Sequence, residues 1–138
     1  MKKPRILLFL CVLLGVLRLD AVVPQLLHYQ GRVAVNNVNF TGLGQFKFAL
    51  VSADGSTSYW SHDGTSVNGG EPTGLLKLDV THGLYSVLLG DATLPGMDAL
   101  PSSVFQNNDV HLRVWFNDGS TGFQQLTPDQ RIAAVGYA

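Results

Sequence analysis

Short runs in which every second residue is apolar, separated by turn-forming residues, recur along the chain and constrain the fold more than any other feature. In the clearest run, Val110, Leu112, Val114 and Phe116 occupy alternate positions. Because alternate side chains of a strand point to opposite faces, such a run predicts a strand with one face toward a core. Helical periodicity is almost absent. About seven or eight short strands at this spacing predict an all-β domain, an antiparallel β-sandwich.

Turn signals and composition refine the prediction for individual segments. Asp54-Gly55-Ser56 predicts a hairpin turn, because Asp-Gly tolerates the positive φ that such turns require. The run 84–90 is apolar on both faces, which favours a central strand. Residues 91–108 form the longest irregular segment, with a helical turn expected after Pro101. Besides 110–116, the predicted strands are 27–35, 45–50, 58–62, 76–80, 84–90, 123–126 and 132–137.

The first 21 residues follow the order of an export signal. A basic start, Met1 to Arg5, precedes an apolar run over residues 6–17 and a polar break at residues 18–21. A membrane-spanning helix needs about 20 apolar residues, so this run is too short to span a bilayer. The sequence therefore predicts a secretory signal peptide over residues 1–21. It also predicts one exported module over residues 22–138, located in the periplasm, at the cell surface or outside the cell.

Cleavage of the signal changes the charge of the chain. The whole sequence has 9 basic and 10 acidic residues, and the part after residue 21 keeps five basic and nine acidic ones, a formal net charge of −4. This charge argues against nucleic acid or an anionic membrane surface as a partner. The single cysteine, Cys11, also lies in the signal, which excludes disulfides and thiol catalysis in the mature module. The charged residues of the signal are Lys2, Lys3, Arg5, Arg18 and Asp20.

Motifs for catalysis or metal binding are not found in the sequence. Asp63, Asn68 and Glu71 could together hold a calcium ion, but no Asp-x-Asp-x-Asp spacing occurs, and Asp-Gly is a common hairpin turn. The four histidines lack the spacing typical of a zinc site. No serine lies in a Gly-x-Ser-x-Gly motif. We therefore expect no enzyme activity, no catalytic residue, no metal and no cofactor.

The aromatic residues suggest one binding site. On the strand that contains Val110 to Phe116, the alternation places Trp115 on the face opposite to the core, beside His111 and Arg113. A tryptophan on a polar sheet face can stack on a sugar ring, with neighbouring donors to its hydroxyls. The alternative is that Trp115 is covered by the 91–108 segment or by a subunit contact. Tyr59 and Trp60 form a second aromatic pair, of which only one can face the core. A carbohydrate-binding module would thus use Trp115, Arg113, His111, Tyr59 and Trp60.

Several stretches resemble one family. They are residues 23–32, 44–50, 59–61, 83–90, 112–116 and 126–138, the last reading Leu-Thr-Pro-Asp-Gln-Arg-Ile-Ala-Ala-Val-Gly-Tyr-Ala. Together they resemble the amino-terminal β-module of large exported bacterial surface proteins, which often continues into collagen-like or tail-fibre-like segments. The resemblance implies a structural or adhesive role and supplies no catalytic residues. Relatives run on where this chain stops, so the chain is either truncated or stands alone, and the apolar residues 132–138 favour truncation at Ala138.

These observations predict a non-catalytic structural or adhesive module of an exported cell-surface or fibre-like protein. Its expected partners are other protein chains, reached through sheet edges, with the last strand as the candidate, or a downstream fibre segment. The mature chain is expected to have no membrane span. The alternative hypothesis is a carbohydrate-binding module that uses surface aromatic residues and binds polysaccharide.

Overall fold

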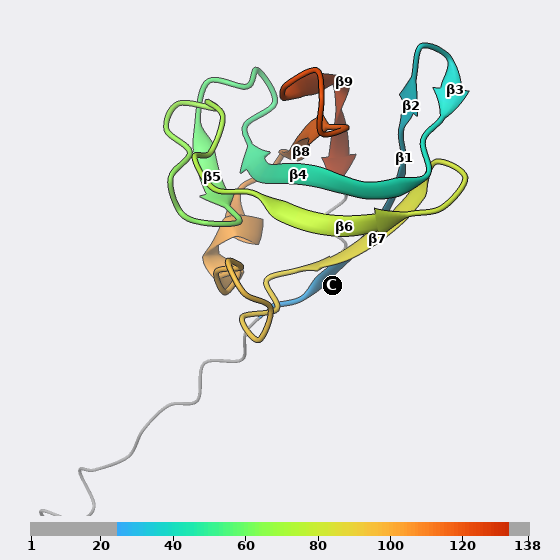
Figure 1. Cartoon of the computed structure of the whole chain (residues 1–138). Helices are drawn as coiled ribbons and strands as arrows, with labels where there is room; N and C mark the ends of the chain where they lie inside the picture. Colours follow the sequence, from blue (N-terminus) through green and yellow to red (C-terminus); the bar gives the residue numbers. More distant parts are fainter. Residues whose placement is uncertain (1–24, 133–138) are drawn as a thin grey trace, which may run out of the picture.

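The computed structural model describes residues 25–132 of the chain, so the predicted signal peptide and residues 133–137 of the last predicted strand lie outside the described residues. Within this range the fold is all-β, as predicted, with one short 3-10 helix, η1 (Figure 1). The elements are β1 (Leu27–Arg32), β2 (Ala34–Val35), β3 (Val38–Asn39), β4 (Gly42–Val51), β5 (Ser58–Ser61), β6 (Leu76–Val80), β7 (Leu84–Leu89), η1 (Ser102–Gln106), β8 (Val110–Asn117) and β9 (Gln124–Ile132).

The strands form two main antiparallel layers. The larger layer has the order β5-β4-β8-β9, and β6 pairs with the first half of β4 along the same edge that β5 uses farther on. The smaller layer is the ribbon β1-β7, which packs on one face of the larger sheet. A tight turn at Thr81-His82-Gly83 leads the chain from β6 directly into β7 and so from one layer to the other. The predicted antiparallel sandwich is confirmed.

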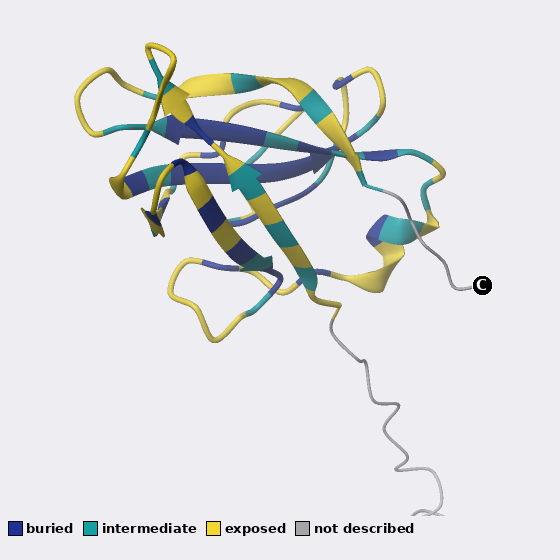
Figure 2. Cartoon of the chain, turned by 90° about the vertical axis from the view of Figure 1, so that its right-hand side faces the viewer, coloured by how far each residue is buried: buried dark blue, intermediate teal, exposed yellow. Residues whose placement is uncertain are grey.

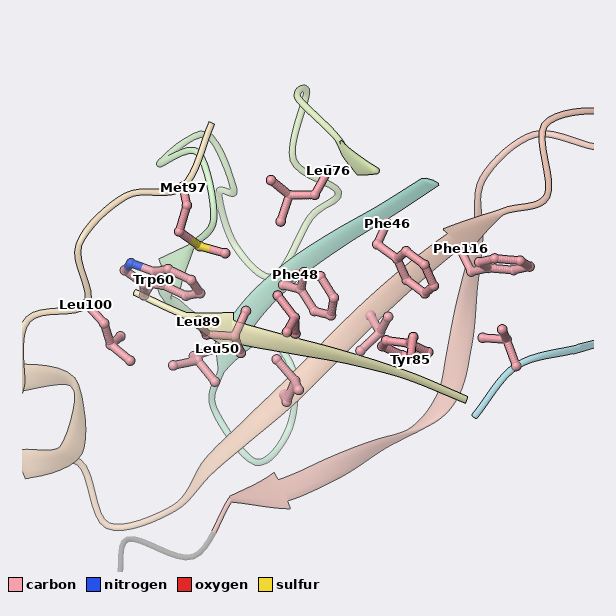
Figure 3. Close-up of a cluster of buried hydrophobic side chains, with 14 of the residues drawn as sticks. Phe46, Phe48, Leu50, Trp60, Leu76, Tyr85, Leu89, Met97, Leu100 and Phe116 are labelled. Carbon is pink, nitrogen blue, oxygen red and sulfur yellow. The ribbon is translucent and has the colours of Figure 1, made fainter. Parts of the chain in front are cut away.

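The main core lies between these layers and is rich in aromatic rings (Figure 3). Phe46 of β4 is central, with its ring centroid 4.3 Å from that of Tyr85 on β7 and 5.1 Å from that of Phe116 on β8. Phe48 and Leu50 follow on the same face of β4 and are fully buried. Because burying each such side chain stabilises the fold by about 1.5–3 kcal/mol, this cluster supplies much of the apolar driving force.

β4, rather than β7, is the strand buried on both faces. Its residues Phe46 to Val51 are all buried, because the main core covers one face and the cluster of Trp115 and Phe123 covers the other. The prediction of a central strand over residues 84–90 was wrong. β7 alternates between buried and exposed positions, and Leu84 is 53% exposed on its outer face. Among the described residues, β7 is hydrogen-bonded to a single strand, β1, and the apolar composition of residues 84–90 did not indicate this.

The carboxyl-terminal strand also differs from the prediction. Residues 123–126 and 132 were expected in two separate strands, but β9 is one nine-residue strand from Gln124 to Ile132. A shift in the register between Leu112 and Val114 of β8 accommodates the Thr127-Pro128-Asp129 segment, which lies between the two predicted strands. Pro128 is tolerated because β9 lies at the edge of its sheet.

The predicted turns are confirmed. The Asp54-Gly55-Ser56 turn joins β4 to β5, and Gly55 has a φ of 77°. The expected helical turn after Pro101 is η1. Residues 36–44 contain the turn and the second strand of a small β2-β3 hairpin and the start of β4.

Candidate binding sites at two sides of the sandwich

Trp115 lies on the face of the large sheet that points away from the main core, as predicted, but it is only 4% exposed. It belongs to a small second cluster with Ala49 and Val51 of β4, and Phe123 packs against this cluster. The cover is therefore Phe123, not the 91–108 segment. The Nζ atom of Lys47 lies 4.2 Å from the centroid of the Phe123 ring. With its ring covered, Trp115 offers no stacking surface for a sugar.

Arg113 and His111, expected beside Trp115, are both held by carboxylates. The Arg113 guanidinium donates to Asp129 of β9, with Nη2 2.7 Å from Oδ2 and Nε 3.0 Å from Oδ1. Its Nη1 donates to the carbonyl oxygen of Gly69 at 3.0 Å. The hydrogen bonds that Arg113 donates to Asp129 raise the pKa of Arg113, against a smaller opposing effect of burial. His111 Nε2 lies 3.0 Å from Asp109 Oδ1. These contacts give both residues a structural role on this face.

Two of the three calcium candidates, Asp63 and Glu71, are bound to other groups. The Asp63 carboxylate accepts hydrogen bonds from the backbone N–H groups of Thr65 and Gly74, at 3.1 and 2.6 Å. Burial tends to raise the pKa of Asp63, but the bonds from Thr65 and Gly74 outweigh it, so the pKa is lowered. Glu71 instead pairs with Lys47, with Nζ 2.7 Å from Oε2. Over residues 25–132, no three His, Cys, Asp or Glu side chains gather in a way that could hold a metal ion.

The second aromatic pair is far from the first and lies beside a cavity. Trp60 is the member that faces the core, 8% exposed, and its indole N–H donates to the carbonyl oxygen of Ala99 at 2.9 Å. Tyr59 is half-buried. Both border a cavity of about 360 Å³ between β5 and the segment that leads to η1, which we name the β5 cavity. Its polar lining comes from Ser58, Ser61, Ser66 and Asp98.

Asp98 was not among the residues expected to form a site. It lies in the irregular segment 91–108, where no periodic pattern indicates which strand it will approach. Its backbone N–H donates to the carbonyl oxygen of His62 at 2.7 Å, which fixes this segment against the end of β5. No local sequence signal could have joined Asp98 to Tyr59.

A second cavity, of about 220 Å³, lies on the side of the molecule where the two layers do not meet, and we name it the β1–β9 cavity. Its walls are Tyr29, Arg32 and Ala34 on one side and Leu126 and Pro128 on the other. Among residues 25–132, neither β1 nor β9 has a strand partner along its outer edge. Figure 2 looks onto this side, where β1 follows one grey terminal trace and β9 runs into the other. The floor consists of the buried side chains of Val33, Tyr85, Leu112 and Val114.

Comparison with known proteins places the chain in one family. Residues 28–129 match a family described as a domain of unknown function, DUF8740. No curated protein and no solved structure matches the chain. The matched range begins in β1 and ends in β9, so it contains nearly all of the sandwich, the whole lining of the β5 cavity and all of the β1–β9 lining except Gln130. The chain therefore belongs to the DUF8740 family.

Proposed function

We propose that the chain is a non-catalytic structural or adhesive module of an exported, fibre-like surface protein, which joins other protein chains at the β1–β9 cavity. One observation carries the proposal: two edge strands without an outer partner among the described residues border the same cavity. The free N–H and C=O groups of an edge strand are a template for pairing with an extended segment of another chain. Export itself rests on the predicted signal over residues 1–21.

The floor of the cavity supports strand insertion. Tyr85, Leu112 and Val114 come from both layers, and all three are buried. An incoming strand would pair through its backbone with an edge and direct every second side chain onto this apolar floor. Affinity would then come from backbone hydrogen bonds, and selectivity from the side chains that the floor accepts.

Of the two edges, β1 is better suited to carry the pairing. β9 has Pro128 near its middle, and proline has no backbone N–H to donate. Proline and charged residues on an edge strand are devices that discourage pairing. β1 contains no proline, and its only charged residue is Arg32, at its end. We therefore assign the pairing edge to β1 and the opposite wall to β9. The candidate edge that the sequence favoured, the last predicted strand over residues 132–137, lies outside the described residues except for Ile132.

The paired charges support the non-catalytic part of the proposal. Lys47 is bound to Glu71, and Arg113 to Asp129, so these ionisable groups hold loops and strands together.

In the described range, no helix has the length and apolar character needed to cross a membrane.

The test is the mass of the exported chain in solution as its concentration rises, measured by sedimentation. We expect the wild-type chain to associate. Ala34→Lys, which places a charge at the wall of the β1–β9 cavity, should shift the equilibrium to monomer by at least tenfold. Ala92→Lys is the matched control, because Ala92 is equally exposed but lies in the loop after β7. A wild-type chain that stays monomeric at its highest soluble concentration, or equal association of both variants, would contradict the proposal.

A further inference from the structure

We propose that the β5 cavity binds a ring of a neutral glycan. This function is independent of assembly at the β1–β9 cavity, because the two sites lie on different elements. The β5 cavity combines a half-buried tyrosine, Tyr59, with three serines and one carboxylate, Asp98. Its volume of about 360 Å³ lies near the lower end of the range for small-ligand sites, which suits one part of a longer chain.

The walls of this cavity are fixed by hydrogen bonds before any ligand arrives. The hydroxyl oxygens of Ser58 and Ser66 are 2.7 Å apart, and the backbone N–H of Ser66 donates to Ser61 Oγ at 3.1 Å. On the other side, the Trp60 indole holds Ala99. These bonds tie the strand, the loop after it and the 98–101 segment into one rigid frame. Such a frame loses little conformational entropy on binding, which favours affinity.

Asp98 supplies the acceptor that a sugar hydroxyl needs. Its side chain is exposed and makes no hydrogen bond or ion pair with another residue of the described range. The carboxylate Oδ2 lies close to Gly64, where a Cβ atom would approach it to 2.8 Å. An ionised carboxylate has only acceptor positions, so its ligand must donate. The Asp98 carboxylate is therefore placed to accept from hydroxyl groups of the ligand.

The remaining lining selects a neutral sugar. A pyranose ring presents C–H groups on a face and hydroxyls around its rim, which match the tyrosine ring and the serine and aspartate oxygens. No lysine, arginine or histidine lines the cavity, so an anionic ligand would meet the Asp98 charge without compensation. A cationic ligand would bind in a salt-dependent way, whereas a neutral glycan would not.

The experiment titrates the full exported chain with four neutral tetrasaccharides: cellotetraose, laminaritetraose, maltotetraose and N-acetylchitotetraose. Calorimetry gives the affinity, and the emission of Trp60 reports on the site. We expect at least one probe to bind, with an affinity unchanged by added sodium chloride. Tyr59→Ala should weaken binding at least tenfold, while Tyr59→Phe, which keeps the ring, should stay within about threefold. Asp98→Asn should weaken binding about fivefold, and the control Asp79→Asn, an exposed aspartate on β6, should not.

Two outcomes would overturn the proposal: none of the four probes binds, or Tyr59→Ala binds as well as wild type. Binding that salt abolishes would identify a cationic-ligand site and also reject it. If Tyr59→Ala fails to fold, as judged by its unfolding curve, the affinities of Asp98→Asn and Asp79→Asn test the proposal instead. Equal affinities of these two variants would then overturn it. The Ala34→Lys variant should bind the probe normally. Failure of assembly and failure of glycan binding are thereby separated.

Discussion

Along one side of the sandwich, β6 runs directly into β7 through a tight turn, whereas along the other side β1 and β9 border a cavity. On the first, closed side, β4 pairs with β6 over Gly42 to Phe46 and with β5 over Ala49 to Val51, and one continuous piece of chain joins the two layers. On the open side, buried side chains of both layers reach the cavity floor. The difference suggests that stability is concentrated on one side and that the other is left available for a partner.

The closed side owes its order to contacts between residues distant in sequence. Asp63 binds the N–H of Gly74, and so closes the loop between β5 and β6. His62 is 1% exposed, and its Nδ1 lies 3.3 Å from the backbone nitrogen of Phe48 on β4. Corresponding hydrogen bonds across the gap between β1 and β9 are not found in residues 25–132. The closed side should therefore respond to mutation more strongly than the open side.

The largest difference is expected between two leucine truncations. Leu76 on β6 is 7% exposed in the main core, so Leu76→Ala should lower the free energy of unfolding by about 2–5 kcal/mol. Leu126 on β9 is only partly buried and borders the cavity, so Leu126→Ala should cost about 1 kcal/mol. Urea unfolding of both variants gives the two values. Equal losses would remove the distinction between the sides.

A smaller effect is expected from the loop on the closed side. Asp63→Ala leaves the N–H of Gly74 without its acceptor and should lower the free energy of unfolding by about 1–3 kcal/mol. Asp54→Ala is the matched control, because Asp54 also caps a turn but binds only Ser52 and Ser56, within that turn. Thermal unfolding compares them. A greater loss in the Asp54 variant would show that the long-range bond is not what orders the loop.

The smallest effect is a dependence of stability on pH. Burial lowers the pKa of His62 below its usual 6.5, against the opposing effects of Asp63 and of the backbone at Phe48 and Gly74. The unfolded chain then binds more protons, so stability is complete above pH 6.5 and is lost as the pH falls below it. Each unit of lowering corresponds to about 1.4 kcal/mol.

Urea unfolding between neutral pH and pH 5 measures this loss. The lowered pKa of Asp63 affects stability only below its usual value of 3.8, outside this window. His62→Gln should flatten the profile, while His28→Gln, an exposed change on β1, should leave the slope in place. A wild-type profile that is already flat would contradict the account of His62.

Local patterns in the sequence predicted where the strands lie better than they predicted what surrounds each residue. Alternation correctly assigned the inward face of β8, and Asp54-Gly55 correctly marked its turn. By contrast, alternation did not show that Phe123 and Glu71 cover Lys47 of β4. The sequence predicted two strands, over residues 123–126 and 132–137, where β9 in fact continues from Gln124 to Ile132 through a shift in register. In both cases the decisive contact comes from a distant segment.

The candidate sites show the same limit. Alternation correctly predicted that Trp115 points away from the main core. Whether Trp115 is exposed, however, depends on how the turn after β8 folds back over it. Tyr59 was identified as an aromatic candidate, yet the carboxylate beside its cavity, Asp98, is contributed by the irregular segment before η1. Local periodicity does not show which distant segment will contact a given residue.

The most direct test of the central claim is amide hydrogen exchange of residues 22–138, measured residue by residue in the dispersed and the assembled states. If β1 is the pairing edge, amides of Leu27 to Arg32 that exchange rapidly in the dispersed chain become protected on assembly, while those of β5 do not change. Assembly that protects β5 or another surface and leaves β1 unprotected would contradict the account.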